Sequence, residues 1–207
     1  MDSIIAIAVD EQVIYPHELV IVTETEPDFL PRATLARSEG RSALLYSKND
    51  LIPFAYYAKG RDKMDLGAIF SMLNGYIRCL IAARDRMLNT GLISSDPEKG
   101  VFIVQEGGSV KVKTVWGMDT IADENEKICR VSEALSKYGR VMGAETSIKR
   151  MTEIIRSENP SLKSCLAAAE RINREWNRIV SPDPGTRSST DQRTDGSVRL
   201  MSSFDPD

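Results

Sequence analysis

The stretch that decides the fold reads DLGAIFSMLNGYIRCLIAARDRML, from Asp65 to Leu88. Its apolar residues recur mostly at steps of three and four, the spacing of one face of an α-helix. Asp65 can accept first-turn amides as an N-cap, and Gly91 stands where a left-handed C-terminal cap is common. The pattern predicts one long amphipathic helix. Its apolar face consists of Leu66, Ile69, Phe70, Leu73, Ile77, Leu80, Ile81, Met87 and Leu88.

A β-hairpin is predicted directly behind this helix. Two runs with strand composition, Val101–Gln105 and Ser109–Trp116, are joined by the turn Glu106-Gly107-Gly108. Successive side chains of a strand point to opposite faces, so one face of the second strand should be buried and the other wet. The first face carries Val110, Val112 and Trp116, and the second carries Lys111 and Lys113.

Apolar runs rich in β-branched residues predict four strands before the long helix. These runs are Ile4–Val9, Glu18–Thr23, Ser42–Ser47 and Ile52–Ala58. The polar turn Lys48-Asn49-Asp50 predicts that the last two form a hairpin. The segment Arg32–Arg37 has mixed character and predicts no element.

Three helices and a polar tail complete the chain. The helices are predicted at Asp123–Tyr138, at Glu145–Arg156, and from a Ser161 cap to Ile179. From Ser181 to Asp207 the composition is too polar to offset chain entropy, which predicts a disordered tail. We therefore expect an α+β fold with N-terminal antiparallel strands, organised as one domain over residues 1–180 and a tail over 181–207.

Composition narrows the classes of function. The net charge is −3 and the pI is about 5.4, which argues against a nucleic-acid binder. The apolar start lacks a basic leader region, and we expect no membrane span, hence a soluble cytoplasmic protein. The three cysteines Cys79, Cys129 and Cys165 lie far apart, which predicts buried free thiols rather than disulfides.

No residue pattern predicts catalysis. The single histidine, His17, follows Pro16 at the start of a predicted strand, so it is interpreted as a surface residue and not as a base. The chain contains no P-loop, no G-x-G-x-x-G and no H-E-x-x-H. Zinc sites draw on closely spaced Cys and His, which are missing too. We therefore predict no catalytic, cofactor-binding or metal-binding residues.

In one stretch of the chain, the predicted elements follow each other in an order found in known proteins. A long helix, a loop carrying Asp96, a hairpin and a hydrophobe-glycine pair follow each other, as in the C-terminal lobe of protein kinases. There the loop reads H-R-D-L-x-x-x-N and the later triplet D-F-G. Ser94-Ser95-Asp96 stands at the first motif and Val115-Trp116-Gly117 at the second. Lys59 corresponds loosely to the strand lysine, so candidates for a vestigial cleft are Lys59, Asp96, Trp116 and Gly117.

The sequence departs from the kinase pattern at the positions that phosphoryl transfer requires, so we expect no catalysis. Phosphoryl transfer needs a metal held by the D-F-G aspartate and the loop asparagine. Val115 stands at the first of these positions and Val101 at the second. No Gly-rich loop precedes these elements. The comparison therefore implies a reduced pseudokinase.

Over roughly Tyr15 to Ile179 the sequence resembles reduced bacterial kinase-like domains. Examples are the cytosolic pseudokinase domain of the EssB/YukC-type component of type VII secretion and a domain of unknown function that precedes FHA modules. The resemblance lies in Leu19–Val22 with Phe29–Pro31, and in Ala43–Tyr46 with Ile52–Phe54. It implies a non-catalytic scaffold that binds a protein partner in a secretion or signalling assembly, as a monomer or an oligomer.

Two alternatives stay open. The first is an enzyme with a carboxylate and lysine site, for which Asp96, Lys111 and Lys113 are the candidates. The second is a subunit of a nucleic-acid complex that uses arginines on helix faces. Those arginines are Arg78, Arg84, Arg86, Arg171, Arg174 and Arg178.

Overall fold

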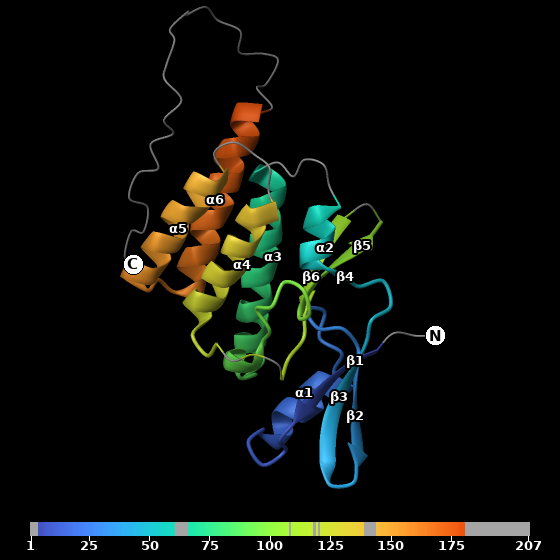
Figure 1. Cartoon of the computed structure of the whole chain (residues 1–207). Coiled ribbons are helices and arrows are strands. Elements are labelled where there is room, and N and C mark those ends of the chain that lie inside the picture. Colours follow the sequence, from blue (N-terminus) through green and yellow to red (C-terminus); the bar gives the residue numbers. More distant parts are fainter. Residues whose placement is uncertain are drawn as a thin grey trace, which may run out of the picture.

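The structure is a computed structural model that describes residues 4–60, 66–107, 109–117, 119, 121–138 and 144–180, without the side chains of residues 106, 138, 144 and 176–180. It is an α+β fold, as predicted, with the four longest helices gathered on one side and two small antiparallel sheets, each with a short helix beside it, on the other (Figure 1). The proposed cap Asp65 and the predicted tail Ser181–Asp207 lie outside the described residues.

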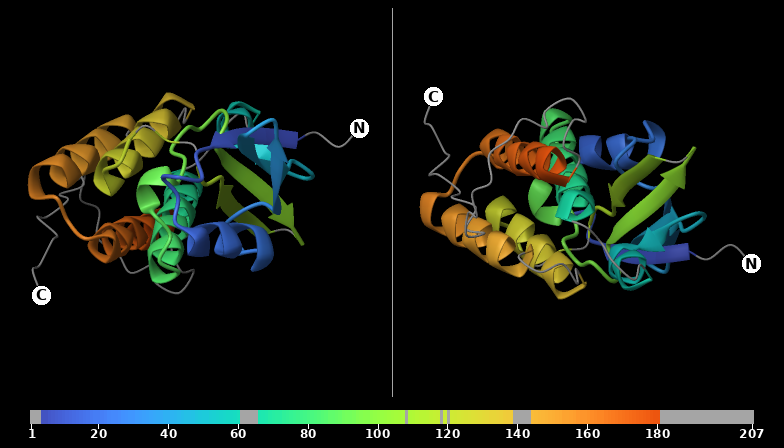
Figure 2. Two further views of the ribbon diagram at one scale, coloured as in Figure 1. Left: turned by 90° about the horizontal axis from the view of Figure 1, so that it is seen from below. Right: turned by 90° about the horizontal axis from the view of Figure 1, so that it is seen from above.

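Helix α3, Leu66–Asp85, occupies the middle of the molecule. Figure 2 shows it between the three C-terminal helices and the two strands of the hairpin that follows it, so it is covered on two sides. Most of its predicted apolar face is buried, with Ile69, Phe70, Leu73 and Leu80 fully inaccessible. Two residues differ from the prediction, since Ile81 is half-buried and Met87, which lies beyond the end of the helix, is 74% exposed. The periodicity of the sequence thus predicted the central helix correctly.

The end of α3 differs from the prediction. Met87, and not Gly91, takes the left-handed conformation, with φ of 59°. The Leu88 amide donates to the Ala83 carbonyl at 2.9 Å, the six-to-one bond of a Schellman motif. Burial of Leu88 in the core explains why the chain turns this early, and Gly91 lies in the short 3₁₀ helix η1, Thr90–Leu92.

The strands form two antiparallel sheets. In the first, the order is β1-β3-β2, with β1 at Ile4–Val9, β2 at Ala33–Ser38 and β3 at Arg41–Ser47. In the second, the order is β4-β5-β6. These strands span Ile52–Pro53, Val101–Glu106 and Ser109–Thr114, so the hairpin predicted behind the long helix is confirmed.

The predicted strand Glu18–Thr23 is wrong, because these residues lie in helix α1, Pro16–Glu24. The Glu18 carboxylate accepts from the Tyr15 amide at 3.2 Å and from the Asn89 amide at 2.5 Å, so it caps the first turn and ties it to the end of α3. Proline in the first turn also favours a helix. These two local signals outweigh the β-branched run that suggested a strand.

The predicted strand Ile52–Ala58 is confirmed only for Ile52–Pro53, and its predicted hairpin with Ser42–Ser47 is wrong. After Pro53 the chain enters helix α2, Phe54–Lys59, whose amide at Ala55 donates to the Pro97 carbonyl at 2.8 Å. Strand β3 pairs instead with β1 and with β2, and β2 covers most of the segment Arg32–Arg37, which predicted no element. A short apolar run fits a buried helix and a strand equally well, which explains the error.

Three helices close the C-terminal side as predicted. They are α4 at Glu124–Tyr138, α5 at Ala144–Glu158 and α6 at Leu162–Val180. The Ser161 hydroxyl accepts from the Ser164 amide at 3.2 Å, which confirms this residue as the cap of α6.

Among the described helices, α3 alone is long and apolar enough to cross a membrane by length and composition. However, 61% of its most apolar window is buried inside the protein, as expected for the core helix that it forms here.

Candidate sites at the Asp96 loop and along helix α3

The loop that carries Asp96 is held by backbone pairing on both sides. The Ser94 amide donates to the Val115 carbonyl at 2.9 Å, and the Val101 amide donates to the Asp96 carbonyl at 2.8 Å. The Asp96 carboxylate in turn accepts from the amides of Glu98 at 2.8 Å and Lys99 at 3.2 Å. Its role in the structure is thus that of a loop cap.

The charged centre of this region is a buried pair that the sequence analysis missed. The Lys127 ammonium lies 3.0 Å from the Asp119 carboxylate, with side-chain exposures of 0% and 3%. Lys127 also donates to the carbonyls of Gly91 at 3.1 Å and Ile93 at 2.5 Å. Helix α4 therefore anchors the segment in front of Asp96 through one lysine.

The Asp119 carboxylate is saturated with donors. It accepts from both the amide and the hydroxyl of Ser95 at 2.6 Å, and from the Ile121 amide at 3.0 Å. The Arg130 guanidinium lies 3.7 Å away. Because these donors and Lys127 occupy its lone pairs, the geometry of Asp119 fits a structural anchor better than a metal ligand.

These contacts set the pKa values of the pair. Burial alone would raise the pKa of Asp119, but hydrogen bonds from Ser95 and Ile121 and the Lys127 charge outweigh it, so the pKa lies below its usual value. Burial lowers the pKa of Lys127, and Asp119 opposes this shift. We interpret the pair as ionised at neutral pH.

Of the kinase-like candidates, Trp116 and Gly117 lie against the segment before Asp96, where Trp116 pairs with Ile93 and the Gly117 amide donates to the Leu92 carbonyl at 2.8 Å. Lys59 ends α2 with its ammonium 5.6 Å from the Tyr56 ring centroid. Trp116 is fully buried, and its indole N–H donates to the Asn89 carbonyl at 3.2 Å. Gly117 has φ of 97°, a conformation that favours glycine. Val101 and Val115, at the metal-ligand positions of the kinase pattern, are fully buried.

A hollow of about 310 Å³ lies beside Asp96. Arg130 and Lys137 contribute cations to it, and Glu98 and Glu133 contribute carboxylates. Lys111 and Lys113, the other candidates for an enzyme site, do not line it. Lys113 instead donates to the Leu30 carbonyl at 3.4 Å, and Lys111 lines a different groove.

That groove runs along α3. It consists of two adjoining hollows of about 430 and 400 Å³ that share Ser71, Gly75, Arg78 and Val110. Buried Phe29, Met72 and Val112 contribute apolar surface, and Val110, predicted to share the buried face of its strand, is 42% exposed at the rim. Cations outnumber carboxylates in the lining: the first are Arg78, Arg86, Lys111 and Arg174, and the second are Asp28 and Glu170.

Only some of the arginines considered for nucleic-acid binding are free of an ion pair within the described part of the chain. Arg78 pairs with Glu170, and Arg84 pairs with Glu124. Arg86 and Arg174 are exposed and line the groove, whereas the side chain of Arg178 lies outside the described part.

The three cysteines are buried free thiols in helices, as predicted. Burial raises the pKa of Cys79 and of Cys129 to about 12, and that of Cys165 to about 11. His17 lies in the first turn of α1, with a ring nitrogen 3.2 Å from the Met87 carbonyl. Among the described residues, no group of three or more Cys, His, Asp or Glu could hold a metal.

Neither family models nor curated protein sequences compared with this chain match it.

Proposed function

We propose that this chain is a non-catalytic, kinase-like scaffold that binds an acidic, amphipathic segment of a protein partner along α3. The observation that carries the proposal is the groove, which joins an apolar floor to a rim rich in cations. The chain as a whole is acidic, with a net charge of −3, so a local excess of cations is the distinctive feature of this surface. Such a rim attracts carboxylates, while the floor accepts apolar side chains.

The kinase-like part of the proposal rests on the order of elements. Helix α3, the Asp96 loop, the β5–β6 hairpin and the Trp116-Gly117 pair follow each other along the chain as in the resemblance. The non-catalytic part rests on how the loop residues are used, because Asp96 caps its own loop and Asp119 is paired with Lys127. An assembly in bacterial secretion or signalling is what the resemblance implies.

The test uses a fluorescently labelled, amphipathic helical peptide that carries Leu on one face and Glu on the other. Fluorescence anisotropy should show binding to the wild-type chain that weakens with added salt. The double variant Arg86→Glu with Lys111→Glu should weaken binding by roughly tenfold or more, since two attractive rim charges become repulsive.

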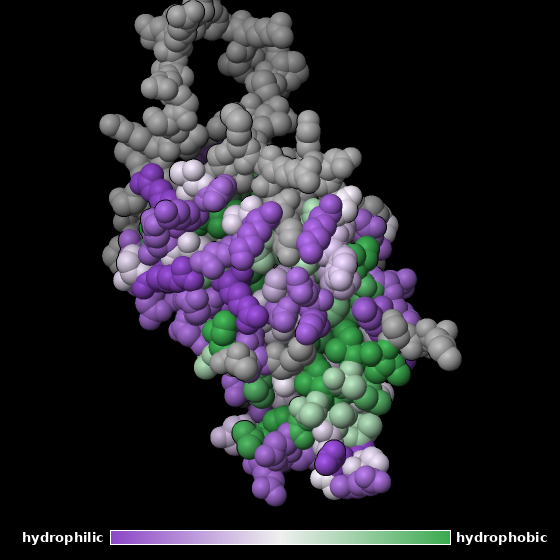
Figure 3. Space-filling model, viewed as in Figure 1, coloured by the Kyte–Doolittle hydropathy of each residue, from purple (hydrophilic) through white to green (hydrophobic). Residues whose placement is uncertain are grey.

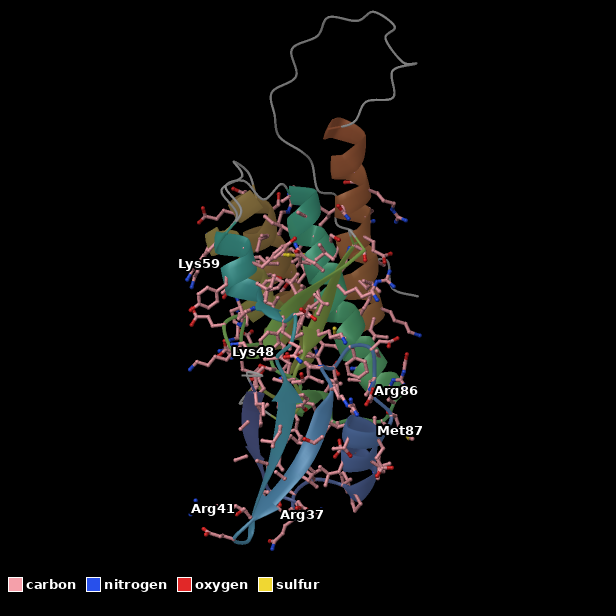
Figure 4. All side chains as sticks on the ribbon, turned by 90° about the vertical axis from the view of Figure 1, so that its right-hand side faces the viewer. Arg37, Arg41, Lys48, Lys59, Arg86 and Met87 are labelled. Carbon is pink, nitrogen blue, oxygen red and sulfur yellow. The ribbon has the colours of Figure 1, made fainter. Side chains whose placement is uncertain are left out.

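The matched control is Arg41→Glu with Lys48→Glu, which changes the net charge equally but away from the groove (Figure 4). We expect it to leave binding nearly unchanged. Equal losses in both variants, or no binding by the wild type, would contradict the groove as the site.

One observation, the hollow beside Asp96, favours a second candidate function, that of an enzyme. If the chain is an enzyme there, nucleotide hydrolysis or phosphotransfer should be detectable and should disappear on Asp96→Ala. That result would replace the scaffold proposal.

A further inference from the structure

Strand β1 is an edge of the first sheet. It pairs with β3 on one side only, in the register Ala6 opposite Leu45 and Ala8 opposite Ala43. In an antiparallel sheet, alternate residues of an edge strand direct their N–H and C=O groups outward. Among the described residues, no backbone group pairs with this outer side of β1. Figure 4 shows β1 outermost, on the side of the sheet away from α1.

This edge lacks the features that normally prevent strand pairing. Its six residues read IIAIAV, without a charge, a proline or a glycine. Natural edges are usually protected by charged side chains, prolines, bulges or covering elements. The opposite edge strand, β2, carries Arg37, which forms an ion pair with Glu11 at 2.6 Å. The β2 edge of the sheet thus carries a charged side chain, whereas the β1 edge carries none.

The face beside the β1 edge is apolar as well. Ile4 is 58% exposed, and Ala6 and Ala8 are exposed on the same side of the strand. Ala43 and Leu45 of β3 continue this face, since they are their register partners. Figure 3 shows the resulting hydrophobic surface over the first sheet. The other side of β1 is used in the core, where Ile7 is buried.

We infer that β1 pairs with β1 of a second copy of this chain, in antiparallel orientation about a two-fold axis. A register centred on Ala6 sets Ile4 of one copy opposite Ala8 of the other, and Ile5 opposite Ile7. Within Ile4–Ala8 all facing residues are then apolar and none carries a charge, so this stretch of the strand is complementary to itself. The two sheets become one sheet of six strands, a common size for a sheet in a globular protein. The inference is independent of the groove along α3.

Sedimentation velocity of the full chain over a range of concentrations tests the inference. The wild type should shift from monomer to dimer as its concentration rises. Ala6→Lys should raise the dimer dissociation constant by roughly tenfold or more, because two lysines would face each other across the two-fold axis.

The matched control is Thr34→Lys. Thr34 and Ala6 both lie opposite Leu45, one on each side of it, so the control adds the same charge to the other edge of the same sheet. It should dimerise like the wild type, and circular dichroism should show both variants folded.

Any one of the following results would overturn the inference. They are a wild type that stays monomeric at all concentrations, a dimer that folded Ala6→Lys leaves intact, and a dimer that Thr34→Lys alone disrupts. Growth into open fibres would also contradict it, because a two-fold contact closes at the dimer.

Discussion

Lys127 shows how a single residue organises the loop region. Its ammonium is held between one carboxylate and two backbone carbonyls with no exposure to solvent. Removing one partner of a buried ion pair is costlier than removing both, because the remaining charge is left in a poor solvent. The pair is therefore a sensitive point of the fold.

Asp119→Asn should reduce the free energy of unfolding by about 3–5 kcal/mol at neutral pH, because it leaves Lys127 buried without a counter-charge. Urea denaturation measures the loss. Asp50→Asn, in the exposed turn after β3, should change the stability little. Equal stability of Asp119→Asn and the wild type would show that the pair is not ionised.

The same variant predicts a pH dependence. The folded-state pKa of Asp119 is lowered, so its stabilising contribution is present above the unfolded-state pKa of about 3.9 and is lost as pH falls through the folded-state value. The stability difference between wild type and Asp119→Asn should shrink at such acid pH. A difference that stays constant down to pH values far below 3.9 would contradict this assignment.

At this scale the sequence predicted some residues and not others. The Ser161 cap of α6 depends only on short-range contacts, and the structure confirms it. The Asp119–Lys127 pair was missed because its partners come from different elements. A signal was nevertheless present: Lys127 lies four residues before Val131 and eight before Leu135, on the apolar stripe of its helix. A charge at such a position indicates a buried partner.

Helix α3 and strand β6 approach each other unusually closely at Gly75. A β-carbon at this position would lie 2.5 Å from Cγ2 and 3.0 Å from Cβ of Val112. Valine is branched at Cβ and has few rotamers, so it cannot move aside easily. The contact also forms part of the groove floor, which makes the spacing of these two elements a condition for the proposed site.

Gly75→Ala should destabilise the protein by about 1–3 kcal/mol through this overlap, although alanine favours helices more than glycine does. Thermal denaturation of the variant and of the wild type measures the difference in stability. Ser71→Ala, one turn earlier on the exposed side of α3, should be neutral or slightly stabilising. A gain in stability at position 75 would mean that α3 and β6 are farther apart than described.

Among the helices, the long ones were predictable from the sequence and the short ones were not. The helices α3 to α6 have enough turns for a periodic pattern, and each was predicted. Helices α1 and α2 have 9 and 6 residues, and their valine-, isoleucine- and tyrosine-containing runs were read as strands. Tertiary hydrogen bonds also hold these two segments: the Asn89 amide donates to the Glu18 carboxylate, and the Ala55 amide donates to the Pro97 carbonyl.

For the whole molecule, the fold class followed from the sequence, whereas the strand order did not. Strand β3 pairs with β1 across α1, and β4 pairs with β5 across α3. Such pairings join segments far apart in the chain, and no local pattern specifies them. The groove and the exposed β1 edge depend on these pairings, which is why neither could be expected from the sequence.

The Tyr46 side chain reaches from the first sheet into the rest of the protein. Its hydroxyl donates to the Trp116 carbonyl at 2.9 Å and accepts from the Trp116 amide at 3.2 Å, while the indole of Trp116 bonds to the segment after α3. The first sheet therefore does not constitute an autonomous folding unit.

Heat should melt both halves in one cooperative transition, with calorimetric and van't Hoff enthalpies in agreement. Scanning calorimetry that resolves two separate heat-absorption peaks would contradict this, and Tyr46→Phe, which unpairs two buried backbone groups, is the variant expected to weaken the coupling.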